Sequence, residues 1–511
     1  MTQRPERIQV VNEVGQSQSL PEGPGEFIQL GRGSRFVFLG LGPNPGVFPG
    51  QVRRGRETFF LECPELEAQL PGHPGGRNPL GFKRIKPEAL TRDFVRTSTL
   101  FWYRPNLKLF PSFWGPLWAR VRLHLHDPPG PCRTEVWLPG SETSLVRREL
   151  IQALHEAGYG VRLLDPQISP GDLLGLLKEG KPKLFLSVNF QGLDPLGESY
   201  HLLAEAGVPV AVWCVDNPFH LVSRLRSGFW TQCSLLVTDS WFLDPLRQHG
   251  AARVFHLPLA AAQHMFQASS ASSAGLIEAA QGLGEQVVFV GRSRFPGKED
   301  FFAGQSLDPG REVAARAMLE RGLRPDYAWW RAQYSARILW PGQEARRVGL
   351  AAETCAEAWR ALCLESACAA GLTVFGDARW RELVPGLSAL RPEVDYYGPL
   401  PSIYRQAGLN LNLTSLLLPR GLTQRHFDVW AAGGVLITDA TPGLDLFPAD
   451  LVREVSFAQA GDIPALAERL GPGRPLREEV RREFAALVAR EHTYGQRVTA
   501  LLAAVGLERR A

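Results

Sequence analysis

From residue 134 onward, short apolar runs alternate with helix-forming segments, and this alternation constrains the fold more than any other feature of the chain. TEVWLPG (134–140) is typical of a strand that ends in a glycine turn. SLVRRELIQALHEAGYG (144–160) has apolar residues at helical spacing, and VRLLDP (161–166) is the next strand. Strands that alternate with helices form parallel βαβ units, which bind ligands at the carboxyl ends of their strands. The sequence therefore predicts an α/β protein.

The same pattern continues in two blocks, separated by QASSASSAG (267–275), a small, polar segment typical of a linker. The first block continues with PKLFLSVN, VPVAVWCVDNP, CSLLVTD and ARVFHLPLA, and the second contains QVVFVGRSR, LTVFGD, VDYYGPL, LNLNLTS and LVREVSFA. We predict one Rossmann-like domain in residues 131–275 and a second in residues 276–485. A C-terminal helix is expected in residues 486–511, and a smaller accessory domain, α/β or β-rich, in residues 1–130.

The accessory region is rich in glycine and proline and contains two predicted strands, RFVFLG and ETFFLEC. FLGLGPNPG (38–46), with Glu62 at the end of the next strand, is similar to a Rossmann-type methyltransferase half-domain. Pro43 and Pro45 remove two of the N–H donors that such a loop needs, so a structural role is favoured over cofactor binding. The aromatic cluster LFWYRPNLKLFPSFWGPLWARV is expected to pack against the next domain, with a membrane-surface role as the alternative.

Composition excludes several classes of protein. The 511 residues are 44% hydrophobic and 21% charged, which is typical of a globular chain. No run of about 18 uncharged apolar residues appears, so we expect no transmembrane segment, and the N-terminus lacks a secretory core. Seven scattered cysteines without a CxxC pair indicate reduced thiols and a cytoplasmic location. The net charge of +4 is spread along the chain, which predicts no nucleic-acid partner.

WCVDNPFH (213–220) places Asp216 and Asn217 at the end of a predicted apolar strand. A carboxylate at that position of an open α/β sheet lies where ligands bind, and it can act as a general base. We therefore take Asp216 as the catalytic candidate. An Asx turn before Pro218, closed by the aspartate's own side chain, is an equally good interpretation.

PRGLTQRHFDVWAAGGVLITD (419–439) is the most specific segment of the chain. Gly421 permits close backbone approach, and Thr423 is predicted to cap a short helix that Gly433 ends. The free N–H groups of the first turn, with Arg420 and Arg425 nearby, would suit a phosphate.

Asp428 lies further along the same predicted helix, where aspartate is unfavourable. Its carboxylate could accept hydrogen bonds from ribose hydroxyls. Arg425 and Asp428 are three residues apart and would share one helix face. The competing interpretation is an amphipathic helix whose polar face is exposed to solvent.

This segment resembles the spore maturation protein CgeB-like group of glycosyltransferases. VAVWCVDNPF, CSLLVTDSWFLDPLRQHGAARVFHLPLAA, VVFVGRS, VDYYGPLP, LNLNLTS and EHTYGQRV resemble that group in the same order, so the resemblance covers about residues 134–502. It implies a glycosyltransferase-B fold, in which two Rossmann-like domains face a cleft, the sugar nucleotide docks on the C-terminal domain and no metal is normally used.

The resemblance also implies site residues. A related group of retaining transferases carries two glutamates eight positions apart, and those positions hold Arg420 and Asp428 here. Asp428 keeps a shorter carboxylate for the ribose, whereas the donor contact usual at the first position is left open by the cation. The donor-binding candidates are Arg292, Gly376, Arg420, Gly421, Thr423, Arg425 and Asp428.

We therefore predict a glycosyltransferase that moves a sugar from a nucleoside-diphosphate donor to an unidentified acceptor, without metal or other cofactor. Fixed N–H dipoles and arginines would stabilise the departing diphosphate. Two alternatives stay open. One is a catalytically silent module that binds a sugar nucleotide or a protein partner, and the other is a sugar-nucleotide epimerase on the same fold.

Overall fold

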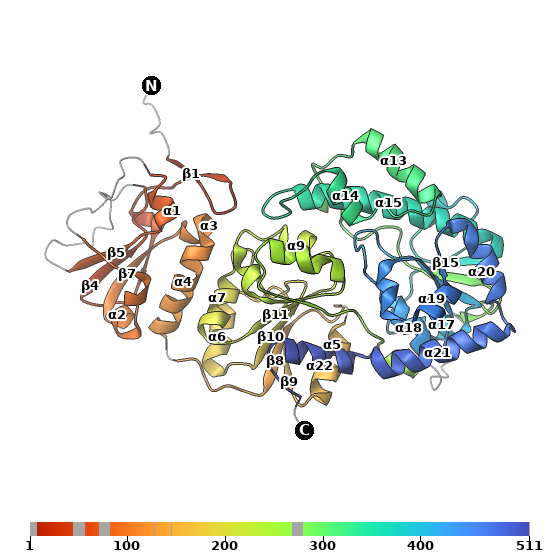
Figure 1. The fold of residues 1–511 in the computed structure, drawn as a ribbon. Coiled ribbons are helices and arrows are strands. Elements are labelled where there is room, and N and C mark those ends of the chain that lie inside the picture. Colours follow the sequence, from red (N-terminus) through yellow and green to blue (C-terminus); the bar gives the residue numbers. More distant parts are fainter. Residues whose placement is uncertain are drawn as a thin grey trace.

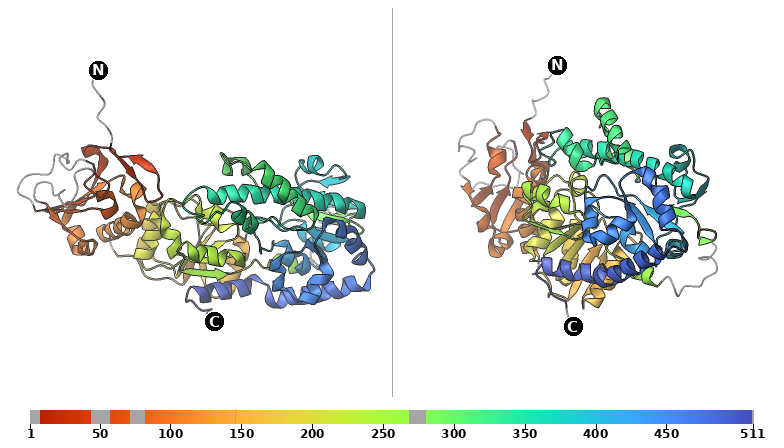
Figure 2. Two further views of the ribbon diagram at one scale, coloured as in Figure 1. Left: turned by 45° about the horizontal axis from the view of Figure 1, so that its top comes forward. Right: turned by 45° about the vertical axis from the view of Figure 1, so that its right-hand side comes forward.

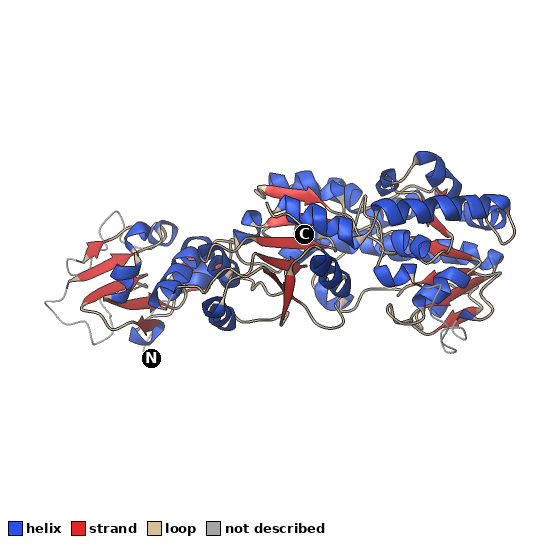
Figure 3. Cartoon of the chain, turned by 90° about the horizontal axis from the view of Figure 1, so that it is seen from below, coloured by secondary structure: helices blue, strands red, loops and turns tan. Residues whose placement is uncertain are grey.

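The computed structural model describes residues 8–43, 57–70, 82–126, 128–144, 146–267 and 280–509. These residues form three lobes that follow one another in a row (Figure 1), and the elongated shape is clearest in the left view of Figure 2. Each lobe is built around its own sheet (Figure 3). Of the predicted linker 267–275, only Gln267 lies within the described residues.

The N-terminal lobe contains a five-stranded sheet with the order β3-β7-β4-β5-β6. Its strands are β3 (Phe27–Leu30), β4 (Arg35–Leu39), β5 (Thr58–Leu61), β6 (Lys83–Arg84) and β7 (Ser98–Tyr103). β3 is antiparallel to β7, and the other pairs are parallel. A separate hairpin joins β1 (Gln9–Val11) to β2 (Ser17–Ser19). Both predicted strands therefore exist as β4 and β5.

The glycine-rich loop of this lobe is held by a side chain of the neighbouring strand end. Glu62 accepts hydrogen bonds from the backbone N–H groups of Leu41 (2.8 Å) and Cys63 (2.9 Å). If the loop bound a cofactor, the acidic residue at this position would be expected to bind the ribose. Here Glu62 accepts hydrogen bonds from backbone N–H groups instead. Pro45 lies outside the described residues.

The aromatic cluster forms β7 and the helices α3 (Asn106–Leu109) and α4 (Pro111–Leu125). α4 packs on α7 (Glu198–Glu205) of the middle lobe, where Trp118 Nε1 donates to Glu198 Oε2 at 3.0 Å. A Cβ at Gly115 would lie 2.3 Å from the ring of His201, so the close approach of the two helices needs a glycine there. The predicted packing against the next domain is thus confirmed.

The middle lobe is a parallel six-stranded sheet with the order β13-β12-β11-β10-β8-β9. Its strands are β8 (Glu135–Pro139), β9 (Gly160–Leu164), β10 (Leu184–Val188), β11 (Val210–Cys214), β12 (Ser234–Val237) and β13 (Arg253–His256). Its helices include α5 (Arg147–Glu156), α6 (Pro170–Glu179), α7, α8 (Pro218–Val222) and α9 (Leu243–Gln248). β10, β11 and β12 are buried along their whole length, which explains their continuous apolar runs.

The C-terminal lobe is a second parallel six-stranded sheet, with the order β16-β15-β14-β17-β18-β19. Its strands are β14 (Val287–Val290), β15 (Leu372–Phe375), β16 (Ala389–Arg391), β17 (Leu409–Asn412), β18 (Leu436–Asp439) and β19 (Ser456–Phe457). Its helices include α12 (Lys298–Phe301), α13 (Pro309–Glu320), α14 (Tyr327–Gln333), α15 (Glu344–Ala367), α17 (Leu400–Gln406), α18 (Arg425–Ala431), α19 (Ala449–Val455) and α20 (Ile463–Arg469).

The end of the chain returns to the middle lobe (Figure 1). α21 (Pro475–Glu491) packs on the C-terminal lobe and runs through the predicted boundary at residue 485. The break comes instead before α22 (Tyr494–Ala504), which packs on α5 and shares its apolar core. Arg497 Nε donates to the carbonyl of Pro258 at 2.9 Å and fixes this return.

Two further findings bear on the class of protein. Within the described ranges, no helix combines the length and the apolar character needed to cross a bilayer. All seven cysteines are free thiols, and all but Cys132 and Cys368 are buried.

Candidate active site

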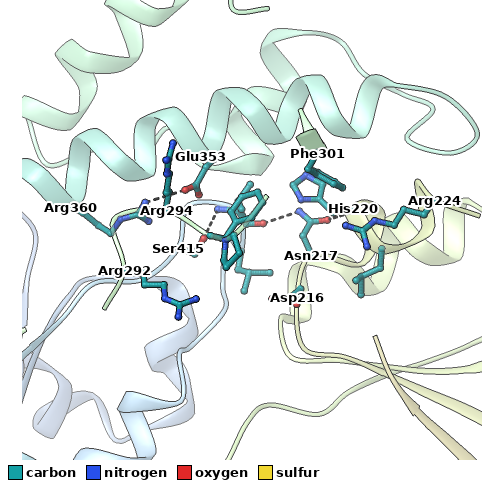
Figure 4. Close-up of a pocket in the computed structure, with 15 residues that line it drawn as sticks. Asp216, Asn217, His220, Arg224, Arg292, Arg294, Phe301, Glu353, Arg360 and Ser415 are labelled. Atoms are coloured by element: carbon teal, nitrogen blue, oxygen red, sulfur yellow. Dashed lines mark hydrogen bonds and ion pairs between the residues drawn. The ribbon is translucent and has the colours of Figure 1, made fainter. Parts of the chain in front are cut away.

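A cavity of about 540 Å³ lies between the middle and C-terminal lobes. Its wall includes residues that directly follow β11, β14 and β17, so the carboxyl ends of both parallel sheets face it. Figure 4 shows Asp216 and Arg224 on one side of the cavity and Arg292 and Arg360 on the other. Two Rossmann-like domains that face a ligand-sized cavity are the arrangement that the resemblance implies. The predicted glycosyltransferase-B fold is confirmed.

Asn217, rather than Asp216, makes the turn at the end of β11. Asn217 Oδ1 accepts from the backbone N–H groups of Phe219 (3.0 Å) and His220 (3.3 Å) and thereby caps α8. Its Nδ2 donates to the carbonyl of Leu417 at 3.0 Å, which joins the two lobes across the cavity. Because Asn217 supplies the cap, the carboxylate of Asp216 is left to face the cavity.

Asp216 is held in place by a neighbouring strand end. Asn189, which follows β10, donates from Nδ2 to Asp216 Oδ2 at 2.7 Å and accepts from the backbone N–H of Val215 at 2.9 Å. The surrounding protein desolvates the carboxyl group and raises the pKa of Asp216, which the Asn189 hydrogen bond and the charge of Arg224 oppose. A carboxyl group with a raised pKa is a stronger base than an ordinary aspartate.

Asn189 was not predicted from the sequence. Its φ is +53° and that of Phe190 is +64°, a left-handed conformation that is unusual for two consecutive non-glycine residues. Strain of this kind tends to gather at functional sites. The sequence does offer one indication of this residue, because an asparagine follows the apolar run PKLFLSV. Asparagine adopts the left-handed conformation more readily than most residues.

The opposite wall carries Arg292, in the loop after β14. Its side chain is 54% exposed and forms an ion pair with Glu393 Oε2, with Nε at 2.8 Å and Nη2 at 2.6 Å. An exposed ion pair contributes little to stability, so the guanidinium can exchange this partner for a ligand anion at small cost.

Buried charges on α15 fix the loop that carries Arg292. Arg360 Nη2 donates to the carbonyl of Ser293 at 3.0 Å and to Glu353 Oε1 at 3.1 Å. Lys298 Nζ reaches Glu357 Oε2 at 3.2 Å. Glu353 and Arg360 line the cavity, yet the sequence shows them only as charges on one long helix, which is why they were missed.

Asp428 lines neither the 540 Å³ cavity nor a second cavity of about 200 Å³ next to Arg420. It is 1% exposed, and its oxygens accept from the backbone N–H of Ala262 (3.0 Å), Tyr396 Oη (2.7 Å) and Gln424 Nε2 (3.2 Å). The sequence interpretations placed this face of α18 either at the donor site or in solvent. In the structure it is instead covered where the two lobes meet. Burial raises the pKa of Asp428 to about 7.

Arg425 lies three residues away, at the carboxyl ends of β14 and β17. Its Nη1 donates to Asn412 Oδ1 at 3.3 Å, and its guanidinium is 5.9 Å from the centre of the Phe289 ring. A Cβ placed on Gly291 would come within 3.1 Å of Arg425 Nη2. Arg425 thus sits behind the loop that carries Arg292, rather than on the cavity wall.

The predicted cap of α18 is wrong in its details. The helix begins at Arg425, and no side chain caps it. Thr423 Oγ1 instead donates to Asn412 Oδ1 at 3.0 Å, because the turn is held by contacts to β17. Gly433, with φ +80°, ends the helix as predicted.

The remaining donor candidates lie apart from the main cavity. Arg420 borders a second cavity of about 200 Å³, and its backbone N–H donates to Asp239 Oδ2 at 2.9 Å. Gly421 and Gly376 serve packing, since a Cβ would lie 2.6 Å from Leu418 Cβ and 2.4 Å from the carbonyl oxygen of Gly291, respectively. The structure therefore brings Asp216 and Arg292 to one cavity but leaves the other candidates around it.

The C-terminal part of the chain is similar to a known protein family. Residues 355–503 match the family model described as "Glycosyl transferase-like". This region is glycosyltransferase-like. It contains α18, the loop before it and the ends of β17 and β18, so the segment singled out in the sequence lies inside the match. No curated protein sequence matches the chain.

The solved structures to which the chain is similar are distant. A glycosyltransferase from Rickettsia africae is 8% identical, with a TM-score of 0.38, over 74% of this chain and 98% of that one. Anabaena HepE in complex with UDP-glucose is 10% identical, with a TM-score of 0.43, over 72% and 99%. A trehalose 6-phosphate synthase from Burkholderia multivorans is 10% identical, with a TM-score of 0.38, over 93% and 98%.

Among the described residues, no group of three or more His, Cys, Asp or Glu side chains is placed to hold a metal ion. The positive charges around the cavity come from Arg224, Arg292, Arg294 and Arg360.

Proposed function

We propose that the protein transfers a sugar from a nucleoside-diphosphate-sugar donor to an acceptor, without a metal ion. The observation that carries the proposal is the cavity between the two Rossmann-like lobes, which has Asp216 on one wall and Arg292 on the other. The glycosyltransferase-like match of residues 355–503 supports it. We also propose that the protein belongs to the CgeB-like group and that it is cytoplasmic, a location that is compatible with its free thiols.

In the proposed reaction, Asp216 accepts the proton of the attacking acceptor hydroxyl. Its raised pKa makes it a stronger base than an ordinary aspartate, and Asn189 fixes its orientation. Arg292 releases Glu393 and binds the diphosphate, whose negative charge grows as the bond to the sugar breaks. Arg425 supports the glycine of that loop from behind. Asp428 would contact a ribose only after Tyr396 has moved away from it.

Ligand binding provides the first test. UDP and UDP-glucose are suitable first probes, because HepE has been solved with UDP-glucose. We expect either ligand to raise the melting temperature of the protein, since a ligand that binds only the folded state stabilises it. Release of UDP from UDP-sugars should then increase when acceptor extract is added. Binding without turnover in any extract would instead indicate a silent binding module, and the absence of binding by any nucleoside diphosphate would refute the proposal.

A further inference from the structure

Two arginines from different lobes flank one aromatic ring beside the cavity. Arg224 follows α8 of the middle lobe, and Arg346 lies in the first turn of α15 of the C-terminal lobe. Their guanidinium carbons are 5.5 Å and 5.0 Å from the centre of the Phe301 ring. Phe301 and Arg224 both line the cavity, and Figure 4 shows Arg224 next to His220.

Among the described residues, Arg224 and Arg346 lack the direct ion pair that the other arginines at the cavity form. Arg292, Arg294 and Arg360 each form an ion pair with a glutamate. Within the described part of the chain, neither Arg224 nor Arg346 forms an ion pair with a carboxylate. Each positive charge also disfavours the other, since burial and then the charge of Arg224 lower the pKa of Arg346.

The neighbouring groups do not neutralise this charge. His220, which packs 5.0 Å from Phe301, is uncharged at neutral pH, because burial lowers its pKa to about 3. The carboxyl group of Asp216 lies at the end of β11, where the proposed proton transfer takes place, and the charge of Arg224 acts to lower its pKa. Apart from this interaction with Asp216, the two cations have no ion-pair partner among the described residues. A bound anion would offset their repulsion and accept charge-assisted hydrogen bonds from both guanidinium groups.

We propose that Arg224 and Arg346 form a binding site for an anionic group of the acceptor, either a phosphate ester or a carboxylate. The assignment to an acceptor rests on the proposed transferase function. An acceptor held in this way would have its hydroxyl group near Asp216, because Arg224 and Asp216 belong to the same wall.

The site is built from other residues than the proposed diphosphate site. Arg346 and Arg360 lie on the same helix, fourteen residues apart, which corresponds to roughly 21 Å at 1.5 Å per residue. Arg360 holds the loop of Arg292 through Ser293. The proposed anion site and the loop of Arg292 therefore contact opposite halves of α15.

Calorimetric titration with inorganic phosphate tests the site in protein that has been saturated with UDP. We expect phosphate to bind alongside UDP, and to bind at least about tenfold more weakly to Arg224→Gln and to Arg346→Gln, which each lose a charge-assisted contact. Arg346→Lys, which keeps the charge, should retain part of the affinity. Arg337→Gln, an exposed arginine between α14 and α15, is the matched control and should bind as the wild type does.

Parallel titration with acetate distinguishes the two chemistries, because a carboxylate site prefers acetate and a phosphate site prefers phosphate. Melting curves show whether each variant is folded. Unchanged phosphate affinity in both glutamine variants would overturn the proposal, as would displacement of phosphate by UDP or failure of both anions to bind. The outcome is separable from that of the transferase proposal, since anion binding can be measured without UDP and UDP binding without an anion.

Discussion

Asn189 Nδ2 donates a 2.7 Å hydrogen bond to Asp216 Oδ2, and this contact joins the ends of two adjacent parallel strands at the wall of the cavity. The left-handed backbone at Asn189 directs its side-chain amide toward Asp216. Because Asn217 caps α8, the carboxylate of Asp216 is not used for that cap. The proposed base is thus positioned by two asparagines, one on each side of it in the fold.

Replacing the proposed base should stop transfer without loosening donor binding. For Asp216→Asn we expect kcat to fall by about 10²–10⁴, because general-base catalysis contributes on that order. Affinity for UDP should stay within about twofold of the wild type. Initial rates and calorimetry measure the two effects. Asp244→Asn, on the exposed surface of α9, is the control with the same chemical change, and equal losses of kcat in both variants would exclude a specific role for Asp216.

The pH dependence of the reaction should depend on Asn189. The Asn189 hydrogen bond opposes the rise in the pKa of Asp216, so its removal in Asn189→Ala should raise that pKa further. A base must be unprotonated to act, and the rate falls as the pH drops through its pKa. The acidic limb of the kcat/KM profile should therefore move to higher pH in the variant. A profile that keeps its position while only the rate falls would indicate a purely structural role.

Arg292 is expected to recognise the diphosphate and not the nucleoside. Arg292→Ala removes a charge-assisted contact worth on the order of 1.5–3 kcal/mol, which is about a ten- to hundredfold weaker affinity for UDP. Uridine should bind the variant and the wild type equally. Titration with both ligands measures this difference. Arg253→Ala, at the edge of the middle sheet, is the control, and an unchanged affinity of Arg292→Ala for UDP would remove Arg292 from the donor site.

Asp428 should make stability depend on pH. Burial raises its folded pKa to about 7, above the unfolded value of about 4. The folded state thus binds more protons between these values, and the free energy of unfolding should fall as the pH rises from about 4 to about 7, with a slope of up to about 1.4 kcal/mol per pH unit. Above pH 7 the contribution is constant. Denaturant titrations should show a smaller slope for Asp428→Asn, and an identical slope would contradict the assignment.

Metal removal should leave the proposed transfer intact. The cations around the cavity are arginines, which can stabilise a departing diphosphate by themselves. We expect equal initial rates before and after treatment with a chelator, measured by release of nucleoside diphosphate. Activity that disappears with the chelator and returns with manganese would mean that a metal ion takes part.

Much of the fold could be predicted because it depends on local patterns. A buried parallel strand such as β11 (VAVWC) is expected to be a continuous apolar run, and glycine at position 433 ends a helix in a left-handed conformation. The same logic located Asp216, since it lies just beyond a strand and the carboxyl ends of parallel strands share one edge of a sheet.

What only the tertiary structure decided is how residues distant in the chain meet. Asp428 looks like a ligand-facing residue in the sequence, yet the return of Ala262 and Tyr396 over α18 buries it. Arg224 and Arg346 are more than a hundred positions apart and have no shared motif, yet both lie on Phe301. Hydrophobic patterning determines which face of a helix or strand is buried, because that depends on neighbours in the chain. It does not determine which other element covers that face, since this depends on how the two lobes pack together.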